Sequence, residues 1–243
     1  MDEIMKILKK NHYVTVDYLV NEIRYSPASI RRDLTLLEKQ GMVSRSYGGV
    51  SLKDTNLSPF RFRQHSMKIA KNAIAKRAAD LVMAGDMVFL DGSTTTQYMG
   101  HFLTDKKDIK VVTCNMILAD YLSENGIETY CTGGKVVEYP GILGGPLMIE
   151  AIEKINADIA FFSTTAFDKD GSLLSITEGG ARTHKVIRAH SEKLVYLCGS
   201  DKFFTKGSFV SMTLDEVDYF ISDGELIDEL KQKFPNTEFI CTK

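Results

Sequence analysis

The stretch that most constrains this chain is residues 26–41, SPASIRRDLTLLEKQG. Ser26 is a favourable N-cap, and Pro27 suits a first helical turn, where its missing N–H would have no partner anyway. Gly41 favours the end of the helix. Apolar side chains recur at i, i+4 and i+7 and form one stripe: Ile30, Leu34 and Leu37. The pattern predicts an amphipathic helix that buries this stripe.

The opposite face and flanks of this helix carry small and basic side chains: Ala28, Ser29, Arg31, Arg32 and Thr35. A small residue beside arginines near a helix N-terminus allows the backbone to approach DNA while guanidinium groups reach bases or phosphates. An ordinary amphipathic surface helix explains this stretch equally well, so the residues around it must decide.

Charge is distributed unevenly along the 243 residues, although the net charge is only −2. Residues 1–77 hold 15 Lys and Arg against 7 Asp and Glu, a net of +8. Residues 78–243 hold 15 against 25, a net of −10. A basic head on an acidic body indicates a polyanion-binding module joined to a second function, with a basic solvated surface as the alternative.

The residues around 26–41 predict a small helical domain with a hairpin. Ile4, Ile7 and Leu8 share one face of a first helix, and Thr15 can cap a second helix. Residues 42–47 and 50–52 alternate like strands, and we expect Gly48-Gly49 to supply the positive φ of the turn between them. Three helices and a hairpin make a winged helix-turn-helix, with Arg45 on the wing able to reach a phosphate or the minor groove.

This head resembles the DNA-binding domain of DeoR-type bacterial transcriptional repressors. The resemblance rests on the core I-R-R-D-L-x-x-L-E-x-x-G of residues 30–41, on Thr15-Val16 before it and on Gly48-Gly49 after it. Tyr47 stands where many members of the family have histidine. The resemblance implies operator DNA as a partner, contacted by these residues: Ser26, Ala28, Ser29, Arg31, Arg32, Thr35 and Arg45.

From residue 87 onward, apolar strands alternate with helices. We expect strands at 87–90, 109–113, 128–131, 159–163, 194–198, 219–222 and 238–241. Helices are expected at 67–85, from 94 to about 103, and near 116–124, 146–155, 178–190 and 225–234. The alternation predicts an α/β fold with a mostly parallel sheet, which binds ligands at the carboxyl ends of its strands.

Polar residues follow several of these strands. The sequence DGSTTT, residues 91–96, follows the first strand and opens a helix, so backbone N–H groups and hydroxyls converge where phosphate could bind. Further polar residues after later strands are Thr113, Asn115, Thr132, Gly133, Gly134, Thr164, Thr165, Asp168 and Lys202. Each alone is compatible with a helix cap or a turn, but their repetition predicts one anion site.

The resemblance to DeoR-type repressors extends into this body, whose sensor domain in the family has the fold of ribose-5-phosphate isomerases and recognises phosphorylated sugars. Residues 91–96 match the family's D-S-G-T-T-T loop, with the Ser-Gly order reversed. The family's D-x-S-K-F becomes Gly199-Ser200-Asp201-Lys202-Phe203, so its aspartate is Gly199, and we expect Asp201 to point elsewhere. The implied effector site comprises Asp91, Gly92, Ser93, Thr94, Thr95, Thr96, Thr113, Asn115, Gly133, Gly134, Glu178, Lys185 and Lys202.

Other chemistries find little support in the sequence. Five histidines (12, 65, 101, 184 and 190) have no metal-ligand spacing and are interpreted as surface or core residues, so no metal and no cofactor are expected. Four cysteines (114, 131, 198 and 241) are interpreted as buried free thiols in a reducing cytoplasm. The chain shows neither a signal-peptide pattern nor an apolar run long enough to span a membrane. No catalytic motif is present either.

These observations predict a winged helix-turn-helix domain at 1–53, a linker at 54–66 and an α/β sensor and oligomerisation domain at 67–243. The expected function is a sugar-phosphate-responsive transcriptional regulator, a repressor and not an enzyme, acting in the cytoplasm as a homodimer or homotetramer. Two alternatives remain at this point. One is a sugar-phosphate isomerase or transferase with a DNA-binding appendage, and the other is a DNA-binding scaffold whose body only oligomerises.

Overall fold

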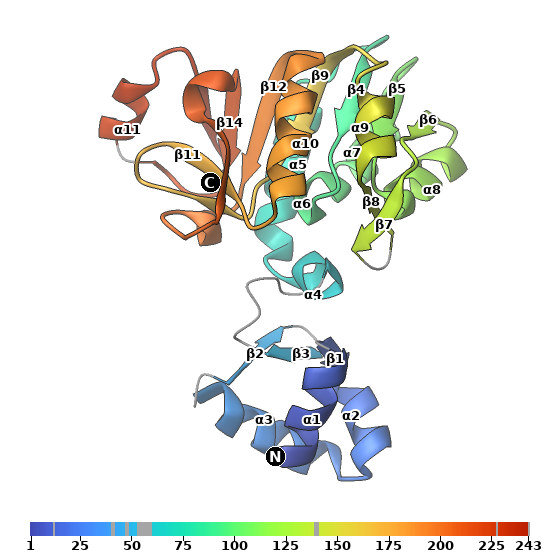
Figure 1. The fold of residues 1–243 in the computed structure, drawn as a ribbon, viewed down its shortest axis with the longest axis vertical. Coiled ribbons are helices and arrows are strands. Elements are labelled where there is room, and N and C mark those ends of the chain that lie inside the picture. Colours follow the sequence, from blue (N-terminus) through green and yellow to red (C-terminus); the bar gives the residue numbers. More distant parts are fainter. Residues whose placement is uncertain are drawn as a thin grey trace. The chain divides into compact units, whose positions relative to one another are not determined.

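A computed structural model describes residues 1–11, 13–39, 42–46, 49–52, 60–138, 141–226 and 228–242. The chain divides into two compact units, Met1–Lys68 and Ile69–Lys243, called the head and the body below (Figure 1). Each unit has its own apolar core and is described by itself.

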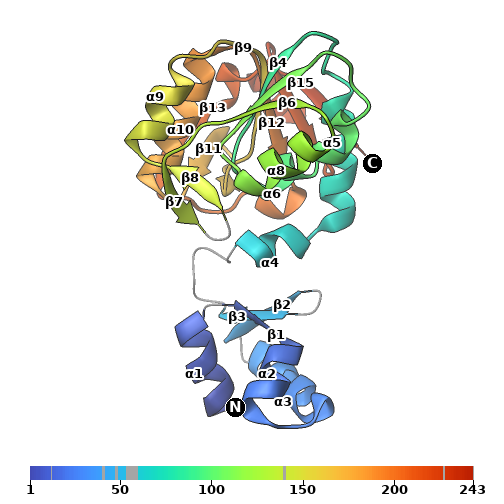
Figure 2. The same cartoon turned by 90° about the vertical axis from the view of Figure 1, so that its right-hand side faces the viewer.

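The head consists of three helices and a three-stranded antiparallel sheet (Figure 2). The helices are α1 (Asp2–Asn11), α2 (Val16–Ile23) and α3 (Pro27–Lys39). The strands are β1 (Tyr13–Thr15), β2 (Val43–Ser46) and β3 (Gly49–Leu52), in the order β1-β3-β2. The predicted stripe of α3 is buried in the core of this unit, together with residues of α1, α2 and the strands: Ile4, Leu8, Val14, Leu19, Val43 and Val50.

Local signals set the helix ends as the sequence predicts. The Thr15 hydroxyl caps α2 by accepting the N–H of Tyr18 at 3.1 Å, and the Ser26 hydroxyl accepts the N–H of Ser29 at 3.2 Å. Arg24 ends α2 in the left-handed region, at φ 56°. Gly41 lies outside the described residues.

The hairpin is present, but Gly49 is not its turn residue. Gly49 is the first residue of β3 and pairs with both Ser46 and Thr15, so it lies within the sheet and not in the turn. The third strand, β1, was not predicted from the sequence. It explains the glycine, because a Cβ on Gly49 would collide with the ring of Tyr13. Tyr47 and Gly48 lie outside the described residues.

The segment predicted as a linker, residues 54–66, contains a helix. Residues 53–59 are outside the described part of the chain, and α4 spans Phe60–His65. Phe60 is fully buried, which is why this short basic segment is ordered. A helix of six residues is too short to show a repeating apolar pattern in the sequence, so it was not predicted.

The centre of the body is a seven-stranded sheet whose described ladders are all parallel, in the order β15-β14-β12-β9-β4-β5-β6. Its strands are β4 (Met87–Leu90), β5 (Lys110–Thr113), β6 (Glu128–Cys131), β9 (Ala157–Phe162), β12 (Ser191–Cys198), β14 (Tyr219–Ser222) and β15 (Glu238–Cys241). These are the seven strands that the sequence predicts, within three residues at each end. A parallel α/β body is therefore confirmed.

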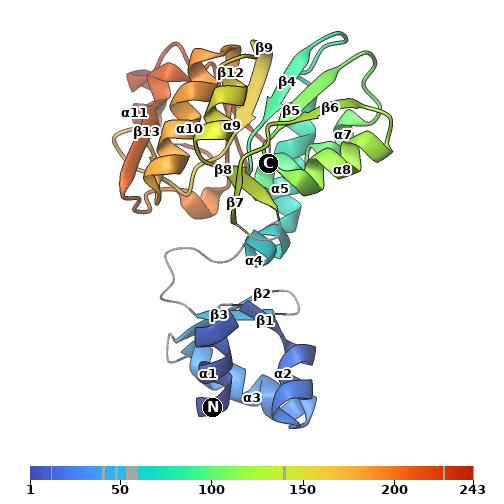
Figure 3. The same ribbon diagram turned by 45° about the vertical axis from the view of Figure 1, so that its right-hand side comes forward.

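Helices cover both faces of this sheet (Figures 1 and 3). One face packs against α5 (Lys68–Ala79), α7 (Gly100–Leu103) and α8 (Met116–Glu124), and the other against α9 (Pro146–Ile152), α10 (Glu178–Ala189) and α11 (Asp228–Lys233). Side chains alternate between the two apolar cores, so Val88 and Leu90 join the first and Phe89 the second. A strand buried on both faces reads as a continuous apolar run, which is how the sequence revealed it.

Three features of the body differ from the sequence-based expectation. The helix expected at 94–103 is divided into α6 (Thr94–Gln97) and α7. A small antiparallel sheet joins β10 (Ala166–Phe167), β11 (Ser172–Ser175) and β13 (Phe209–Thr213). A second pairs β7 (Lys135–Glu138) with β8 (Ile142–Gly144). These strands are short, and β7 is largely exposed, so no apolar alternation distinguishes them from loops.

Two adjacent glycines before β7 make a matched pair for testing this fold. Both have positive φ, 72° at Gly133 and 112° at Gly134. A Cβ on Gly134 would lie 2.7 Å from the carbonyl oxygen of Gly144, whereas one on Gly133 would have nothing within 4 Å.

We expect Gly134→Ala to lower the free energy of unfolding of the body by about 2–4 kcal/mol, because backbone strain and overpacking add. Gly133→Ala should cost about 1–2 kcal/mol, from the left-handed φ alone. Urea denaturation followed by circular dichroism measures both. Equal losses for the two variants would show that the approach of Gly134 to β8 is not a constraint.

Candidate DNA-binding surface and effector site

The outer face of α3 is exposed on the head. The inner stripe is fully buried, while Ala28, Arg31, Arg32 and Thr35 are exposed and Ser29 is half-buried. The Ser26 hydroxyl is exposed and also lies 3.0 Å from the Ser29 hydroxyl. The predicted DNA contacts on α3 therefore share one accessible face.

The wing residue Arg45 lies against this same face. Its Nη1 donates a hydrogen bond to the Thr35 hydroxyl at 2.9 Å, and that hydroxyl donates to the carbonyl of Arg31 at 2.9 Å. Glu38 also contacts Arg45, through the backbone N–H at 3.3 Å and through Nη1 at 3.8 Å. The structure thus brings the predicted wing and helix contacts together into one basic surface.

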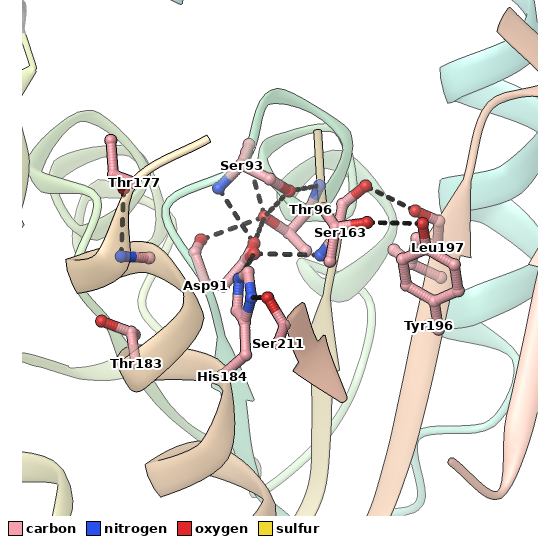
Figure 4. Close-up of polar contacts among 12 residues, drawn as sticks. Asp91, Ser93, Thr96, Ser163, Thr177, Thr183, His184, Tyr196, Leu197 and Ser211 are labelled. Atoms are coloured by element: carbon pink, nitrogen blue, oxygen red, sulfur yellow. Dashed lines mark hydrogen bonds and ion pairs between the residues drawn. The ribbon is translucent and has the colours of Figure 1, made fainter. Parts of the chain in front are cut away.

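In the body, Asp91 is the centre of a buried polar network at the carboxyl end of β4 (Figure 4). Its Oδ1 accepts the backbone N–H of Ser93 at 2.9 Å and the hydroxyl of Thr96 at 2.7 Å. Ser93 in turn caps α6 by accepting the N–H of Thr96 at 3.1 Å. The Asp91 carboxylate therefore fixes the shape of the loop 91–96.

The second carboxylate oxygen of Asp91 joins the loop to other elements. Oδ2 accepts the backbone N–H of Ser163, directly after β9, at 3.0 Å. It also lies 3.7 Å from Nε2 of His184 on α10. Burial by itself raises the pKa of Asp91, but the neighbouring His184 and the N–H groups of Ser163 and Ser93 outweigh the effect of burial and hold the pKa below its usual value. Asp91 is a buried anion that organises the site.

His184 is a site residue that the sequence interpretation missed. It is buried, and its Nδ1 lies 3.0 Å from the Ser211 hydroxyl on β13. The predicted α10 contacts, Glu178 and Lys185, are both exposed. Helical spacing could have identified the histidine, because Ala181, His184 and Ile187 recur at i+3 and form the buried face of α10.

The loop 91–96 lies against the end of β5. A Cβ on Gly92 would lie 2.6 Å from Ile142 and 3.3 Å from the Cys114 sulfur, so glycine is required at this close approach. This contact gives the Gly92-Ser93 order a reason, since Ser93 is then the helix cap. Thr94, Thr95 and Thr96 are all buried.

Thr113 and Asn115 at the end of β5 have internal roles. The Thr113 hydroxyl accepts the N–H of Asn115 at 3.1 Å, and Asn115 Oδ1 caps α8 by accepting the N–H groups of Ile117 and Leu118. Since Oδ1 faces the helix, Nδ2 faces the other way. That nitrogen is buried and has no hydrogen-bond partner among the described residues. An unsatisfied buried donor is costly and requires an explanation, for which a ligand suffices.

Lys202 is connected to Asp91 through Ser163, which contacts Asp91 by its backbone N–H and Lys202 by its hydroxyl. Its Nζ donates to the Ser163 hydroxyl at 2.7 Å, and that hydroxyl donates to the carbonyl of Leu197 at 2.5 Å. The expectation that Asp201 points elsewhere is wrong. A Cβ on Gly199 would collide with the Asp201 carboxylate, so this acid occupies the space of a side chain at 199. The reason is that Ser200–Lys202 is a 3-10 helix and not an extended segment.

The remaining candidates lie outside this network. Gly133 and Gly134 are exposed in the loop before β7. Asp168 is a turn residue between β10 and β11, where its Oδ1 accepts the N–H groups of Asp170 and Ser172.

The four cysteines are free, but only two of them are buried as expected. Cys114 and Cys198 are inside the body, where burial raises the pKa of Cys198 to about 12 and that of Cys114 well above its usual range. Cys131 and Cys241 are exposed, because their strands, β6 and β15, are the two edges of the sheet. Within the described ranges, no group of three or more acids, histidines or cysteines could hold a metal. Nor is any helix in that part of the chain long and apolar enough to cross a membrane.

A winged helical head with a basic face, joined to an α/β body with a buried polar site, defines a DNA-binding regulator with a sensor domain. Two family models match: a DeoR-like helix-turn-helix domain over residues 1–56 and a DeoR C terminal sensor domain over residues 67–224. The chain belongs to the DeoR family of transcriptional regulators.

Relatives match over nearly the whole length. The HTH-type transcriptional regulator GlpR of Haloferax volcanii is 31% identical over 92% of this chain and 88% of its own. The glycerol-3-phosphate regulon repressor of Escherichia coli is 27% identical, over 91% and 88%. The HTH-type transcriptional repressor GlcR of Bacillus subtilis is 30% identical, over 90% and 86%. These relatives are named as regulators and repressors and not as enzymes, so the chain is a DNA-binding transcriptional regulator.

Two solved structures resemble part of the chain. Ribose 5-phosphate isomerase A from Methanocaldococcus jannaschii is 16% identical over 55% of this chain and 53% of its own, with a TM-score of 0.40. The delta subunit of eIF2B from Chaetomium thermophilum is 19% identical over 66% and 59%, with a TM-score of 0.48.

The lowered pKa of Asp91 predicts a pH-dependent stability. We expect Asp91→Asn to lower the free energy of unfolding of the body by about 2–3 kcal/mol at pH 7, because buried donors lose a charged acceptor. The stabilisation by a depressed carboxyl is complete above its unfolded pKa of about 4 and is lost as pH falls through the folded value. The difference between wild type and variant should therefore shrink in acid, as measured by urea denaturation from pH 7 to pH 3. A difference that is constant over this range would contradict the charged state assigned to Asp91.

The exposed face of α3 predicts different roles for two arginines. If Arg32 contacts a base, Arg32→Ala should weaken binding to a duplex selected from a random pool by about 1–3 kcal/mol. Arg45→Ala should weaken binding to all duplexes and reduce the salt dependence by about one phosphate contact. Lys110→Ala, which removes the same charge from the body, is the control. Wild-type affinity of the Arg31/Arg32 double alanine variant in gel shifts would disprove the assignment of α3 as the recognition helix.

Proposed function

We propose that the body binds a phosphorylated sugar and that this effector alters operator binding by the head. The observation that carries the proposal is the loop 91–96, held rigid by Asp91 and bordered by two unusual donors. These donors are the buried Nδ2 of Asn115 and the ammonium of Lys202. A rigid cluster of N–H, hydroxyl and ammonium groups suits a phosphate ester.

The phosphate would bind at the first turn of α6. The N–H groups of Thr94 and Thr95 open the helix and have no acceptor within it. The hydroxyls of these two threonines have no hydrogen-bond partner among the described residues, whereas the Thr96 hydroxyl is occupied by Asp91. Asp91 is itself an anion and buried, so in this proposal it shapes the loop and does not contact phosphate.

The sugar would lie beyond the phosphate, toward the ends of β5 and β12. Asn115 Nδ2 offers a donor to a sugar hydroxyl, and the Asp201 carboxylate offers an acceptor at the place a side chain of residue 199 would fill. Gly133, Gly134, Glu178 and Lys185 remain proposed contacts at the margin of the site, where all four are accessible. The names of the relatives, which include a glycerol-3-phosphate regulon repressor, agree with a small phosphate ester.

The regulatory cycle in this proposal requires more than one copy of the chain. A helix-turn-helix head reads one half-site, and operators present paired half-sites to symmetric dimers. We therefore propose a homodimer or homotetramer, acting in the cytoplasm as a repressor, in which the effector changes the pairing of heads. The effector can do so only by binding the two arrangements with different affinity.

A thermal-shift screen of the full chain tests the proposal. Fructose 6-phosphate, ribose 5-phosphate and glycerol 3-phosphate should be compared with their unphosphorylated forms. A true effector at one hundred times its Kd should stabilise the body by about 2.7 kcal/mol, and inorganic phosphate should compete weakly.

Thr95→Val, which removes one hydroxyl and keeps the shape, should abolish most of the shift. Thr104→Val, the same substitution at the C-terminal end of α7, is the matched control and should retain the thermal shift. Equal stabilisation by a free sugar and its phosphate would contradict the phosphate site.

A further inference from the structure

We propose that Glu38, an acid on the DNA-binding surface, is a positioning residue that supports specific DNA recognition by holding Arg45 on α3. The inference goes beyond the proposed effector function. It rests on the proposal that Arg45 contacts DNA.

The two side chains that make polar contacts with Arg45 among the described residues both lie on α3. Glu38 Oε1 accepts the backbone N–H of Arg45 at 3.3 Å, and Oε2 lies 3.8 Å from its Nη1. The same Nη1 donates to Thr35 at 2.9 Å. Both ends of the arginine, its backbone and its guanidinium, are therefore tied to α3.

The fold explains why this arrangement is available. β2 is an edge strand, since the sheet order is β1-β3-β2, so half of its N–H groups have no strand partner. Thr35 and Glu38 are three residues apart on α3 and therefore lie on the same helical face, which is turned toward β2. The N–H of Met42, which donates to the carbonyl of Leu37 at 2.9 Å, and the buried Val43 fix the start of the strand.

Stability does not account for the carboxylate. The side chains of Arg45 and Glu38 are 31% and 44% exposed, and an ion pair of that exposure contributes little to folding. A carboxylate on a DNA-binding face also repels phosphate, so by charge alone Glu38 should weaken binding. Glu38 instead holds the Arg45 side chain in one conformation. A long arginine side chain that is already fixed loses less conformational entropy when DNA arrives.

The proposal thus predicts that replacing Glu38 weakens binding to specific DNA, whereas loss of its negative charge alone would strengthen binding. Glu38→Gln keeps an acceptor for the N–H of Arg45 but loses the attraction for its guanidinium. We expect it to bind a duplex selected by the wild-type chain about threefold to tenfold more weakly, the equivalent of ordering one long side chain. Its affinity for a scrambled duplex of equal length should fall less or stay unchanged, because a non-specific complex does not hold Arg45 on one fixed phosphate and because a repulsive negative charge is gone.

The matched control is Glu22→Gln, the same substitution at an exposed acid on α2. It removes the same charge, and Glu22 is not among the polar partners of Arg45 in the described part of the head, which are Thr35 and Glu38. Glu22→Gln should leave the ratio of the two affinities unchanged. Circular dichroism melting of the full-length variants checks that the head is folded.

A double-mutant cycle completes the test. In the Arg45→Ala background, Glu38→Gln should no longer change the specificity ratio, because the group that it positions is gone. Retained or increased specificity in Glu38→Gln alone, or an equal loss in both backgrounds, would overturn the proposal. If Arg45→Ala itself has no effect on any duplex, the DNA contact of Arg45 fails, and that outcome is distinguishable from a failure of Glu38.

Discussion

The body of this protein depends on one buried carboxylate. Asp91 accepts hydrogen bonds from Ser93, Thr96 and Ser163 and lies beside His184, so one side chain ties the end of β4 to the end of β9 and to α10. A buried charge is tolerable only when it is paired and hydrogen-bonded on every side. That condition is met by groups from separate elements, so the carboxylate joins these elements into one network. The Ser211 hydroxyl extends the network through His184 to β13.

The head uses a weaker version of the same device at its surface. Arg45 is held by Thr35 and Glu38, so the wing and α3 present their basic groups as one unit. The two networks differ in energy, because burial strengthens electrostatic interactions and solvent screens them. The buried network of the body fixes the shape of the loop 91–96, whereas the exposed one in the head orders an arginine that remains accessible.

The sequence predicted the parts of this structure that depend on local pattern. The buried stripe of α3, the caps at Thr15 and Ser26, and the seven apolar strands were all evident, because each is set by residues close in the chain. The parts that were missed depend on partners distant in sequence. Helical spacing marks His184 as a buried residue of α10, but its link to Asp91, 93 positions earlier, appears only when α10 packs beside β4. Asp201 was misjudged because a 3-10 turn, not a strand, follows β12. The exposure of Cys131 and Cys241 follows from strand order, which no single strand encodes.

We propose that a phosphorylated effector binds at the Asp91 network and that the network transmits the effect of binding to α10. Hydrogen exchange of the full chain, with and without a phosphorylated sugar that stabilises the body, tests this most directly. With the effector bound, we expect slower exchange at residues 92–96 and at Ser163, extending into α10 around His184. In Asp91→Asn, we expect any protection to be confined to the loop. Protection that leaves residues 92–96 unchanged and appears instead around β14 and β15 would show that the effector binds elsewhere.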